Sequence, residues 1–586
     1  MSFTVHIGAT DAKNQLYDLN SSSLKNSLSG ESVDYLIITT DDFESTLEPL
    51  AIWKTQKGLV SKIELVSDIQ QKYSGRNTPE KIKNCIIDYQ SNNNTQWVLL
   101  AGDQNHVPSG YVLCLDGFPY DGDFVRCDSF YTDLDNNWDL NNDGLWGSEY
   151  DEYDFEPEVY VGRLTANNEN EMENLVQRIL NYEKNPPVGS WMSHAMFAGS
   201  ILQFDQDWNN DSNVDYGECD GNRVNNFIKN LLPDNWTSIF LAQTQGVKGS
   251  DNYSDIQLEY NNLKFAINEG CSIGTIFAHG SPQSMGIDQW VTDYDGDMLF
   301  DYTDDPYYGD GTPIDVMVRS SFIDTSYALL APEDDKLGLF YLGSCSTGTF
   351  DDADDCLSEY FLKNAAIGCV AASHVAWGED QWYERDHGGW FIEGLGFRFW
   401  EQLFQYNQPG KALALAKADY VSDRDGSSES NDYPEWEDKT LKQYNLLGDP
   451  EVPIWLLIPK ELNISEIAPQ NGGTADLNLL ITADEKPVQG VIITYTKKNI
   501  PIWKGETNEN GTIVVPISQV DDSGDFLTAS KAGFLPDQIS FDIQIQNEEQ
   551  NDIAGYDILI FSIIILSFIC LSSIYYKHSS SKKKAI

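Results

Sequence analysis

The chain has 586 residues, which predicts two to four domains, and its 41% hydrophobic and 12% aromatic content excludes a wholly disordered protein. It carries 92 acidic against 37 basic residues, a formal net charge of −55. A field of this sign repels nucleic acid and anionic membrane surfaces, so nucleic acid is excluded as a partner. It favours cations and basic substrates, although most of the carboxylates are expected only to solvate the surface.

The first 190 residues alternate apolar runs with segments of helical spacing. Residues 1–30 are polar and rich in Ser and Asn, which is typical of a loose lead-in. The strand–helix order that follows predicts a parallel, doubly wound sheet over residues 31–190. Strands are expected at 34–40, 58–66, 97–103 and 158–164, and helices at 43–57, 79–90 and 169–185.

A second α/β subdomain is expected over residues 191–458, with the joint near Pro186 and Pro187. Its apolar runs are of the length and composition of buried strands, and helical stretches lie between most of them. These runs are at 195–201, 237–243, 272–278, 338–344 and 367–373.

After Pro459 the pattern changes to short alternating runs divided by turn residues, which predicts an immunoglobulin-like β-sandwich at 461–546. An acidic linker follows at 547–557. Residues 558–576 are 19 residues without a charge, long enough for a transmembrane helix of about 30 Å.

The basic tail at 577–586 favours the cytoplasmic side of a membrane, which would place the body outside the cell. The first twenty residues, however, have neither the basic nor the apolar region of a signal peptide. We expect an export signal upstream of Met1. The alternative is a tail-anchored protein whose body lies in the cytosol, against the charge rule.

Nine cysteines are present, and no C-x-x-C pair occurs, which argues against a structural zinc site. A bridge between Cys114 and Cys127 is one arrangement that the sequence leaves open.

Two apolar strands end in residues with reactive side chains. The first ends in His279-Gly280 and the second in Ser344-Cys345. Active sites of parallel sheets form beyond the C-terminal ends of strands, so the imidazole and the thiol are expected to meet there. The imidazole can take the thiol proton, and the thiolate can attack a carbonyl carbon. The main-chain N–H groups of Gly280 and Cys345 are candidate oxyanion donors.

This order of motifs resembles the caspase-like clan of cysteine peptidases, and within it the gingipain family. The resemblance covers about residues 31–546. It is carried by the segments WVLLAGDQNHVP (97–108), EVYVGRL (158–164), NYEKN (181–185), FAHGS (277–281), GSCSTGTF (343–350) and NLLGDPEVPIW (445–455).

The resemblance implies that Cys345 is the nucleophile and His279 the base. It also implies an acid that orients the histidine, for which Asp205 is the candidate and Asp207 the alternative. Trypsin-like members bind Arg or Lys through an acid further on, which points to Glu218 or Asp220. The family implies protein or peptide substrates. The Asp-rich segment 288–306 lies between the two catalytic motifs as an insertion that gates substrate access or binds calcium.

Calcium is the expected cofactor, because acidic and amide oxygens recur at alternate positions and hard oxygen ligands suit Ca²⁺. The segment Asp139-x-Asn141-x-Asp143-Gly144 matches the first half of an EF-hand loop, but Tyr150 occupies the twelfth position. The alternative is solvated acidic loops. Candidate ligands are Asp133, Asp135, Asp139, Asn141 and Asp143, then Asp293, Asp295, Asp297 and Asp301, then Asp351, Asp352, Asp354 and Asp355.

The sequence thus predicts a membrane-anchored cysteine endopeptidase at the cell surface, which degrades external protein or processes exported proteins. Two alternatives stand beside it. One is a calcium-stabilised adhesion or structural protein on an inactive peptidase scaffold, and the other is a cytosolic, tail-anchored, caspase-like regulator.

Overall fold

The computed structural model describes residues 32–114, 124–207, 213–214, 217–250, 254, 256–294, 296–300, 315–327, 332, 335–352, 354–379, 389–423, 434–466, 476–516 and 525–541. The predicted lead-in, acidic linker, transmembrane segment and basic tail lie outside these residues.

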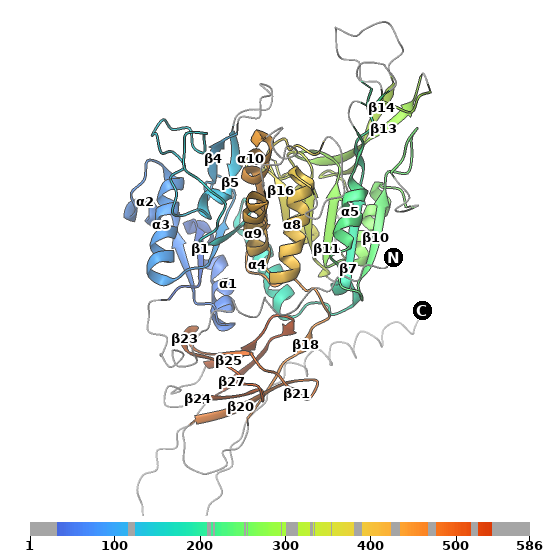
Figure 1. The fold of residues 1–586 in the computed structure, drawn as a ribbon. Coiled ribbons are helices and arrows are strands. Elements are labelled where there is room, and N and C mark those ends of the chain that lie inside the picture. The colour runs from blue at the N-terminus through green and yellow to red at the C-terminus, as the bar shows by residue number, and fades with distance from the viewer. Residues whose placement is uncertain are drawn as a thin grey trace, which may run out of the picture.

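One ten-stranded mixed sheet forms the centre of the α/β body (Figure 1). The sequence predicted two sheets, but β17 lies between β16 and β6 and joins the two halves into one. β17 runs antiparallel to β16, and the other neighbouring pairs are parallel. The strand order is β10 (Thr237–Ala242), β7 (His194–Gly199), β11 (Ile273–Phe277), β15 (Gly338–Gly343), β16 (Ala366–Ala372), β17 (Tyr444–Gly448), β6 (Tyr160–Leu164), β3 (Trp97–Ala101), β1 (Tyr35–Thr39) and β2 (Ser61–Leu65).

Both faces of the sheet are buried along its central strands, which are mostly apolar, whereas the edge strand β2 is only partly buried. In β1, Tyr35 and Ile37 pack into one core, and Leu36 and Ile38 into another on the opposite face. The first face is covered by α1 (Glu44–Gln56), α5 (Gly221–Lys229), α8 (Phe391–Tyr406) and α9 (Pro409–Ser422). The second is covered by α2 (Val66–Lys72), α3 (Thr78–Asn93), α6 (Tyr260–Glu269) and α7 (Leu357–Asn364).

Helix α4 (Glu169–Lys184) packs into the same core as α1, α5, α8 and α9. The remaining elements of the body are shorter or lie at its rim. The helical ones are α10 (Pro434–Gln443) and the 3-10 turns at Asp41–Phe43, Asp128–Tyr131 and Ser190–Ser193. The strands are the pairs β4 (Gly110–Leu113) with β5 (Phe124–Cys127) and β8 (Ile201–Gln203) with β9 (Cys219–Asp220), and the three-stranded β12 (His279–Ser281), β13 (Ser284–Thr292) and β14 (Val316–Asp324).

Cys114 and Cys127 lie near this rim and are both buried with free thiols, so the bridge that the sequence left open is not formed.

Two four-stranded antiparallel sheets follow the body and enclose a separate apolar core, which makes a β-sandwich. Its immunoglobulin-like topology stays a prediction. One sheet contains β19 (Asn463–Glu466), β20 (Asp476–Ala483), β21 (Lys486–Pro487) and β24 (Thr512–Pro516), and the other contains β23 (Ile500–Glu506), β22 (Ile492–Lys497), β25 (Asp525–Ser530) and β27 (Asp537–Phe541). A small pair, β18 (Lys460–Glu461) with β26 (Phe534–Leu535), lies beside them.

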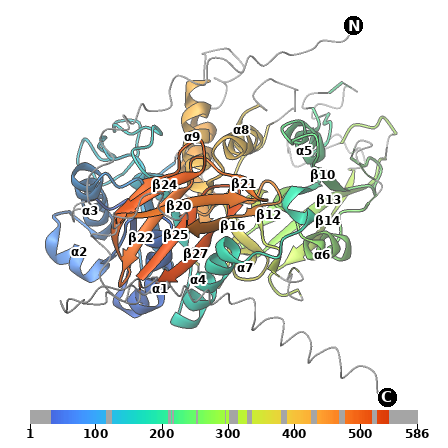
Figure 2. The ribbon, with the colours of Figure 1, turned by 90° about the horizontal axis from the view of Figure 1, so that it is seen from below.

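The sandwich packs against the C-terminal end of α1 (Figure 2). Lys504 Nζ donates to the Gly58 carbonyl at 2.6 Å, and Ser530 Oγ donates to the Lys57 carbonyl at 2.7 Å. Helix C-termini lie at the N-terminal edge of a parallel sheet. The sandwich is therefore at the edge opposite the one where the strands end and where catalytic residues are expected.

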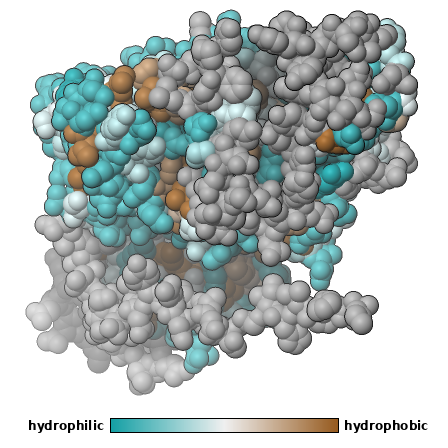
Figure 3. Space-filling model, turned by 45° about the horizontal axis from the view of Figure 1, so that its top comes forward, coloured by the Kyte–Doolittle hydropathy of each residue, from teal (hydrophilic) through white to brown (hydrophobic). Residues whose placement is uncertain are grey.

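The surface of the body agrees with its acidic composition. On the face shown in Figure 3, the described residues are mostly hydrophilic, and hydrophobic atoms appear in small separate patches.

Candidate active site

Cys345 and His279 follow two paired strands of the sheet. β11 and β15 run parallel and in register, with Phe277 opposite Gly343, so each of the two residues comes two positions beyond that pair. The main chains stay together past the strand ends, because the Ala278 N–H donates to the Gly343 carbonyl at 3.2 Å. The imidazole and thiol segments therefore meet at neighbouring strand ends.

Gly280 lies directly against the segment that carries Cys345. A Cβ atom added at Gly280 would lie 2.5 Å from the Cys345 carbonyl oxygen and 2.8 Å from Ser344 Cβ. Real Cβ atoms do not come this close, so the approach of β12 to this segment requires glycine. The predicted oxyanion donors, the N–H groups of Gly280 and Cys345, thus belong to two segments in direct contact.

Cys345 lies in a turn held by the loop after β16. Its thiol is partly exposed and donates to the Ala376 carbonyl, with an Sγ–O distance of 3.2 Å. Ser346 has φ of +56°, and its N–H donates to the His374 carbonyl at 2.8 Å. A left-handed conformation is unfavourable for serine and is kept only where the surroundings impose it. The loop after β16 therefore holds the turn and with it the orientation of the thiol.

His279 faces a carboxylate on the next strand. Its Nε2 lies 3.4 Å from Asp288 Oδ2. Desolvation by the surrounding protein lowers the pKa of His279, and the positive charge of Arg319 lowers it further. The charge of Asp288 and a hydrogen bond with the Leu202 main chain act in the opposite direction. A lowered pKa keeps the imidazole neutral near pH 7, the form that a general base requires.

Asp288 is a site residue that the sequence reasoning did not single out. It lies on β13, two residues after Gly286, which is paired with His279 in the antiparallel ladder. Side chains two apart on a strand share a face. The signal was the turn at Pro282, which reverses the chain so that the segment after His279 returns beside it.

The contacts that the structure gives for Asp205, the acid expected to orient the histidine, are with other groups. Asp205 Oδ2 pairs with Lys248 Nζ at 3.0 Å, and Asp205 Oδ1 accepts the Glu218 N–H at 2.8 Å. Asp207 is buried, at 2% exposure. The structure places Asp288, rather than Asp205, against the imidazole. Sequence alone could not exclude Asp205, because Lys248 lies 43 residues away.

The two candidate specificity acids also have partners inside the protein. Glu218 forms ion pairs with Lys248 and, at 3.1 Å, with Arg223. Asp220 is fully buried and caps α5 through the Asn222 N–H at 2.9 Å, and it accepts the Ser250 hydroxyl at 2.6 Å. Recognition of Arg or Lys by either acid stays a prediction, and these contacts would compete with it.

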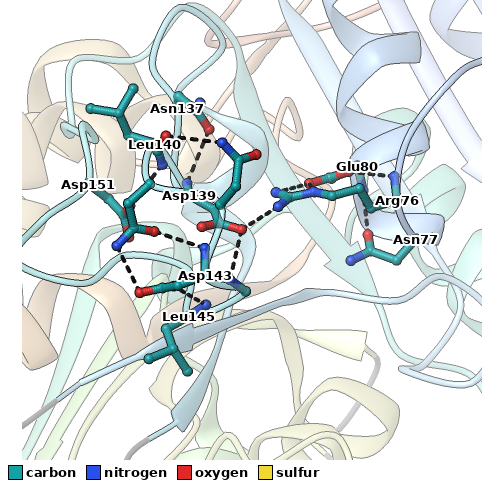
Figure 4. Close-up of polar contacts among 12 residues, drawn as sticks. Arg76, Asn77, Glu80, Asn137, Asp139, Leu140, Asp143, Leu145 and Asp151 are labelled. Carbon is teal, nitrogen blue, oxygen red and sulfur yellow. Dashed lines mark hydrogen bonds and ion pairs between the residues drawn. The ribbon is translucent and has the colours of Figure 1, made fainter.

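The first acidic segment brings three carboxylates together. Asp133, Asp135 and Glu158 each offer an oxygen within 4.8 Å of the others. In the adjacent EF-hand-like loop, Arg76 pairs with Asp139 and occupies one of its oxygens (Figure 4). Of the residues predicted to bind calcium in this segment, Asp139 is therefore already paired with a cation, whereas Asp133 and Asp135 belong to a group of three carboxylates.

The other two acidic segments are described only in part. Asp295 and Asp301 lie outside the described residues, and the Asp293 carboxylate accepts the Gly296 N–H at 2.7 Å. In the third segment, Asp351 pairs with Arg126 at 2.7 Å and Asp355 with Lys363 at 2.7 Å. These contacts are those of ordinary acidic turns and surface ion pairs.

A thiol and an imidazole at adjacent ends of parallel strands, with a carboxylate against the imidazole, form the arrangement of a cysteine peptidase. Residues 29–455 match the model of peptidase family C25. The match covers more than half of the chain, and the chain belongs to this family, that of the gingipain cysteine peptidases.

Individual relatives agree with this membership. Gingipain R2 of Porphyromonas gingivalis is 22% identical over 260 residues, which are 44% of this chain and 29% of that protein. Gingipain R1 of the same organism is 22% identical over 44% of this chain and 21% of that protein. The matched segment thus spans less than a third of these relatives.

Two solved structures share the fold. The crystal structure of the Arg-specific cysteine proteinase gingipain R has a TM-score of 0.60 at 14% identity, over 87% of this chain and 98% of that one. A structure described only as a protease has a TM-score of 0.57 at 17% identity, over 87% and 97%. At these identities the likeness shows the caspase-like α/β fold alone.

Within the part of the chain that the structure covers, none of the helices is both long and apolar enough to cross a bilayer. The segment predicted to do so, 558–576, is not in that part.

Proposed function

We propose that this chain is a cysteine endopeptidase that uses Cys345 as nucleophile and His279 as general base. The observation that carries the proposal is the in-register pairing of β11 with β15, which brings both residues to one edge of the sheet. Family membership supports the reaction class.

The contacts of the site support an ordered reaction. His279 takes the Cys345 proton as the sulfur attacks the scissile carbonyl carbon, and the carbonyl π electrons pass to oxygen. The N–H groups of Gly280 and Cys345 donate to that oxyanion. Collapse of the tetrahedral intermediate breaks the C–N bond, and His279 returns its proton to the leaving amine. A water molecule, deprotonated by His279, then hydrolyses the thioester and frees the thiol.

The proposed setting is the cell surface, with the body anchored through the segment 558–576 and acting on external or exported protein. The charge pattern of the tail supports this orientation. A direct test is carbonate extraction of membranes followed by protease accessibility of the body on intact cells. Recovery of the body in the soluble fraction, or its protection inside intact cells, would contradict this setting.

We also propose that calcium binds through Asp133, Asp135 and Glu158. Their grouped oxygens suit a hard cation, and burial together with the two aspartates raises the pKa of Glu158. Bound calcium would neutralise these carboxylates. Calcium should then raise the Tm of the full chain but not of Glu158→Gln, with Glu48→Gln, at an exposed position on α1, as the control. An equal rise of Tm with calcium in all three proteins would contradict calcium binding at these carboxylates.

The test of the peptidase assignment uses the full chain on a mixed peptide library. Wild type should cleave, Cys345→Ala should not, and Cys369→Ala should retain activity, because Cys369 is a buried free thiol on the neighbouring strand β16. The residues before the cut sites show whether Arg or Lys is preferred. Cleavage that persists in Cys345→Ala, or folded wild type that cleaves nothing, contradicts the assignment.

A further inference from the structure

The antiparallel hairpin of β13 and β14 lies outside the central sheet and brings a carboxylate and a guanidinium close to His279. Asp288 on β13 is paired directly with Arg319 on β14. The hairpin extends from the edge of the sheet at which the strands carrying His279 and Cys345 end (Figure 1). It begins at Ser284, five residues after His279.

The contacts form a chain of three side chains. Arg319 binds Asp288 through two hydrogen bonds, Nε to Oδ1 at 2.6 Å and Nη2 to Oδ2 at 2.5 Å. The same Oδ2 lies 3.4 Å from His279 Nε2. Asp288 is 6% exposed, whereas the Arg319 side chain is 70% exposed. The Asp288 carboxylate thus lies between the exposed Arg319 guanidinium and the His279 imidazole.

We propose that Asp288 is the positioning residue of His279 and that Arg319 positions Asp288 in turn. The proposal rests on the peptidase function proposed above. It assigns the histidine-orienting acid to the hairpin after the His-Gly motif instead of the loop after β7, where Asp205 is held by Lys248.

The chemistry follows from which ring nitrogen faces the acid. A carboxylate at Nε2 favours the tautomer that carries its proton there, and Nδ1 is then the nitrogen that takes the Cys345 proton. When the imidazolium forms, the ionised Asp288 stabilises it. A bidentate guanidinium keeps a carboxylate ionised and also fixes its plane, whereas a lysine ammonium supplies the charge without fixing the plane.

The two residues have opposite effects on the protonation of His279. Asp288 favours the imidazolium and Arg319 disfavours it. Removing the acid should therefore lower the pKa of His279, while removing the guanidinium should raise it. Loss of packing alone would not give shifts of opposite sign.

The experiment measures His279 itself in the full chain. Histidine labelled with ¹³C at Cε1 is titrated by NMR in the Cys345→Ala background, and His279→Gln assigns the signal among the seven histidines. We expect Asp288→Asn to lower the pKa of His279 and Arg319→Gln to raise it. Val318→Thr, at an exposed position next to Arg319, is the control and should leave it unchanged.

Activity is measured in parallel with Cys345 intact. Asp288→Asn should lower kcat about 10- to 100-fold with little change in KM, since general-base catalysis contributes about 10²- to 10⁴-fold. Arg319→Lys should keep more activity than Arg319→Gln. An unchanged pKa of His279 in Asp288→Asn, or shifts of the same sign in both variants, overturns the proposal. Because the titration needs no turnover, it answers this question even if the wild type cleaves nothing.

Discussion

Replacing Gly280 with alanine should disable the site without unfolding the protein. The added Cβ would lie 2.5 Å from the Cys345 carbonyl oxygen, about 0.9 Å short of an ordinary contact of 3.4 Å or more. The obstacle is main chain, so the segment of Cys345 has to move by a comparable distance. A misplacement of about 1 Å at a reacting centre costs about 100-fold in rate.

The assay for this prediction is kcat/KM on a fluorogenic peptide, with Tm measured alongside. Gly189→Ala is the matched control, because a Cβ there meets its nearest atom at 3.4 Å, and it should keep full activity. A Gly280→Ala protein that keeps more than half of the wild-type kcat/KM would show that the two segments do not pack as described.

Two further predictions concern stability. Burial and the nearby Glu379 raise the pKa of Glu393 to about 8, so the contribution of this group to stability is fully present below pH 4.5. On the order of 3 kcal/mol of that contribution is lost by pH 7, as the pH rises toward 8. Glu393→Gln has no such proton to lose and should exceed wild type at pH 7 but not at pH 4.5 in urea unfolding; equal pH profiles would contradict this. Lys54→Met leaves the buried Asp449 without the cation that pairs with it, and leaves Glu183 and Glu451 with Lys57 alone. It should cost about 3–5 kcal/mol. Lys460→Met, in an exposed pair, should cost under about 1 kcal/mol, and a similar loss in both would contradict the account.

The central strands and the two main site residues could be predicted because their signals are local. The runs before His279 and Cys345 are uniformly apolar, and such runs read as buried parallel strands. Their adjacency follows from the rule that active sites gather at the C-terminal strand ends.

The rest depended on pairings between distant segments. Asp288 reaches His279 through a hairpin register, and Glu158 joins Asp133 across 25 residues, so neither was identified. The segment 445–455 resembles the end of the family's catalytic region. The sequence did not indicate that the start of this segment forms β17, which pairs with β16 in the central sheet. Asp205 had the right position in sequence, but its partner Lys248 could only be found in three dimensions.

In the proposed mechanism, Cys345 forms the covalent intermediate with help from His279. The most direct test incubates the full chain with a peptide ester, quenches it in acid and maps the acyl group by mass spectrometry. We expect a thioester on Cys345 in wild type, none in Cys345→Ala, and strongly reduced formation in His279→Ala. An acyl group on another residue, or undiminished acylation of His279→Ala, would contradict it.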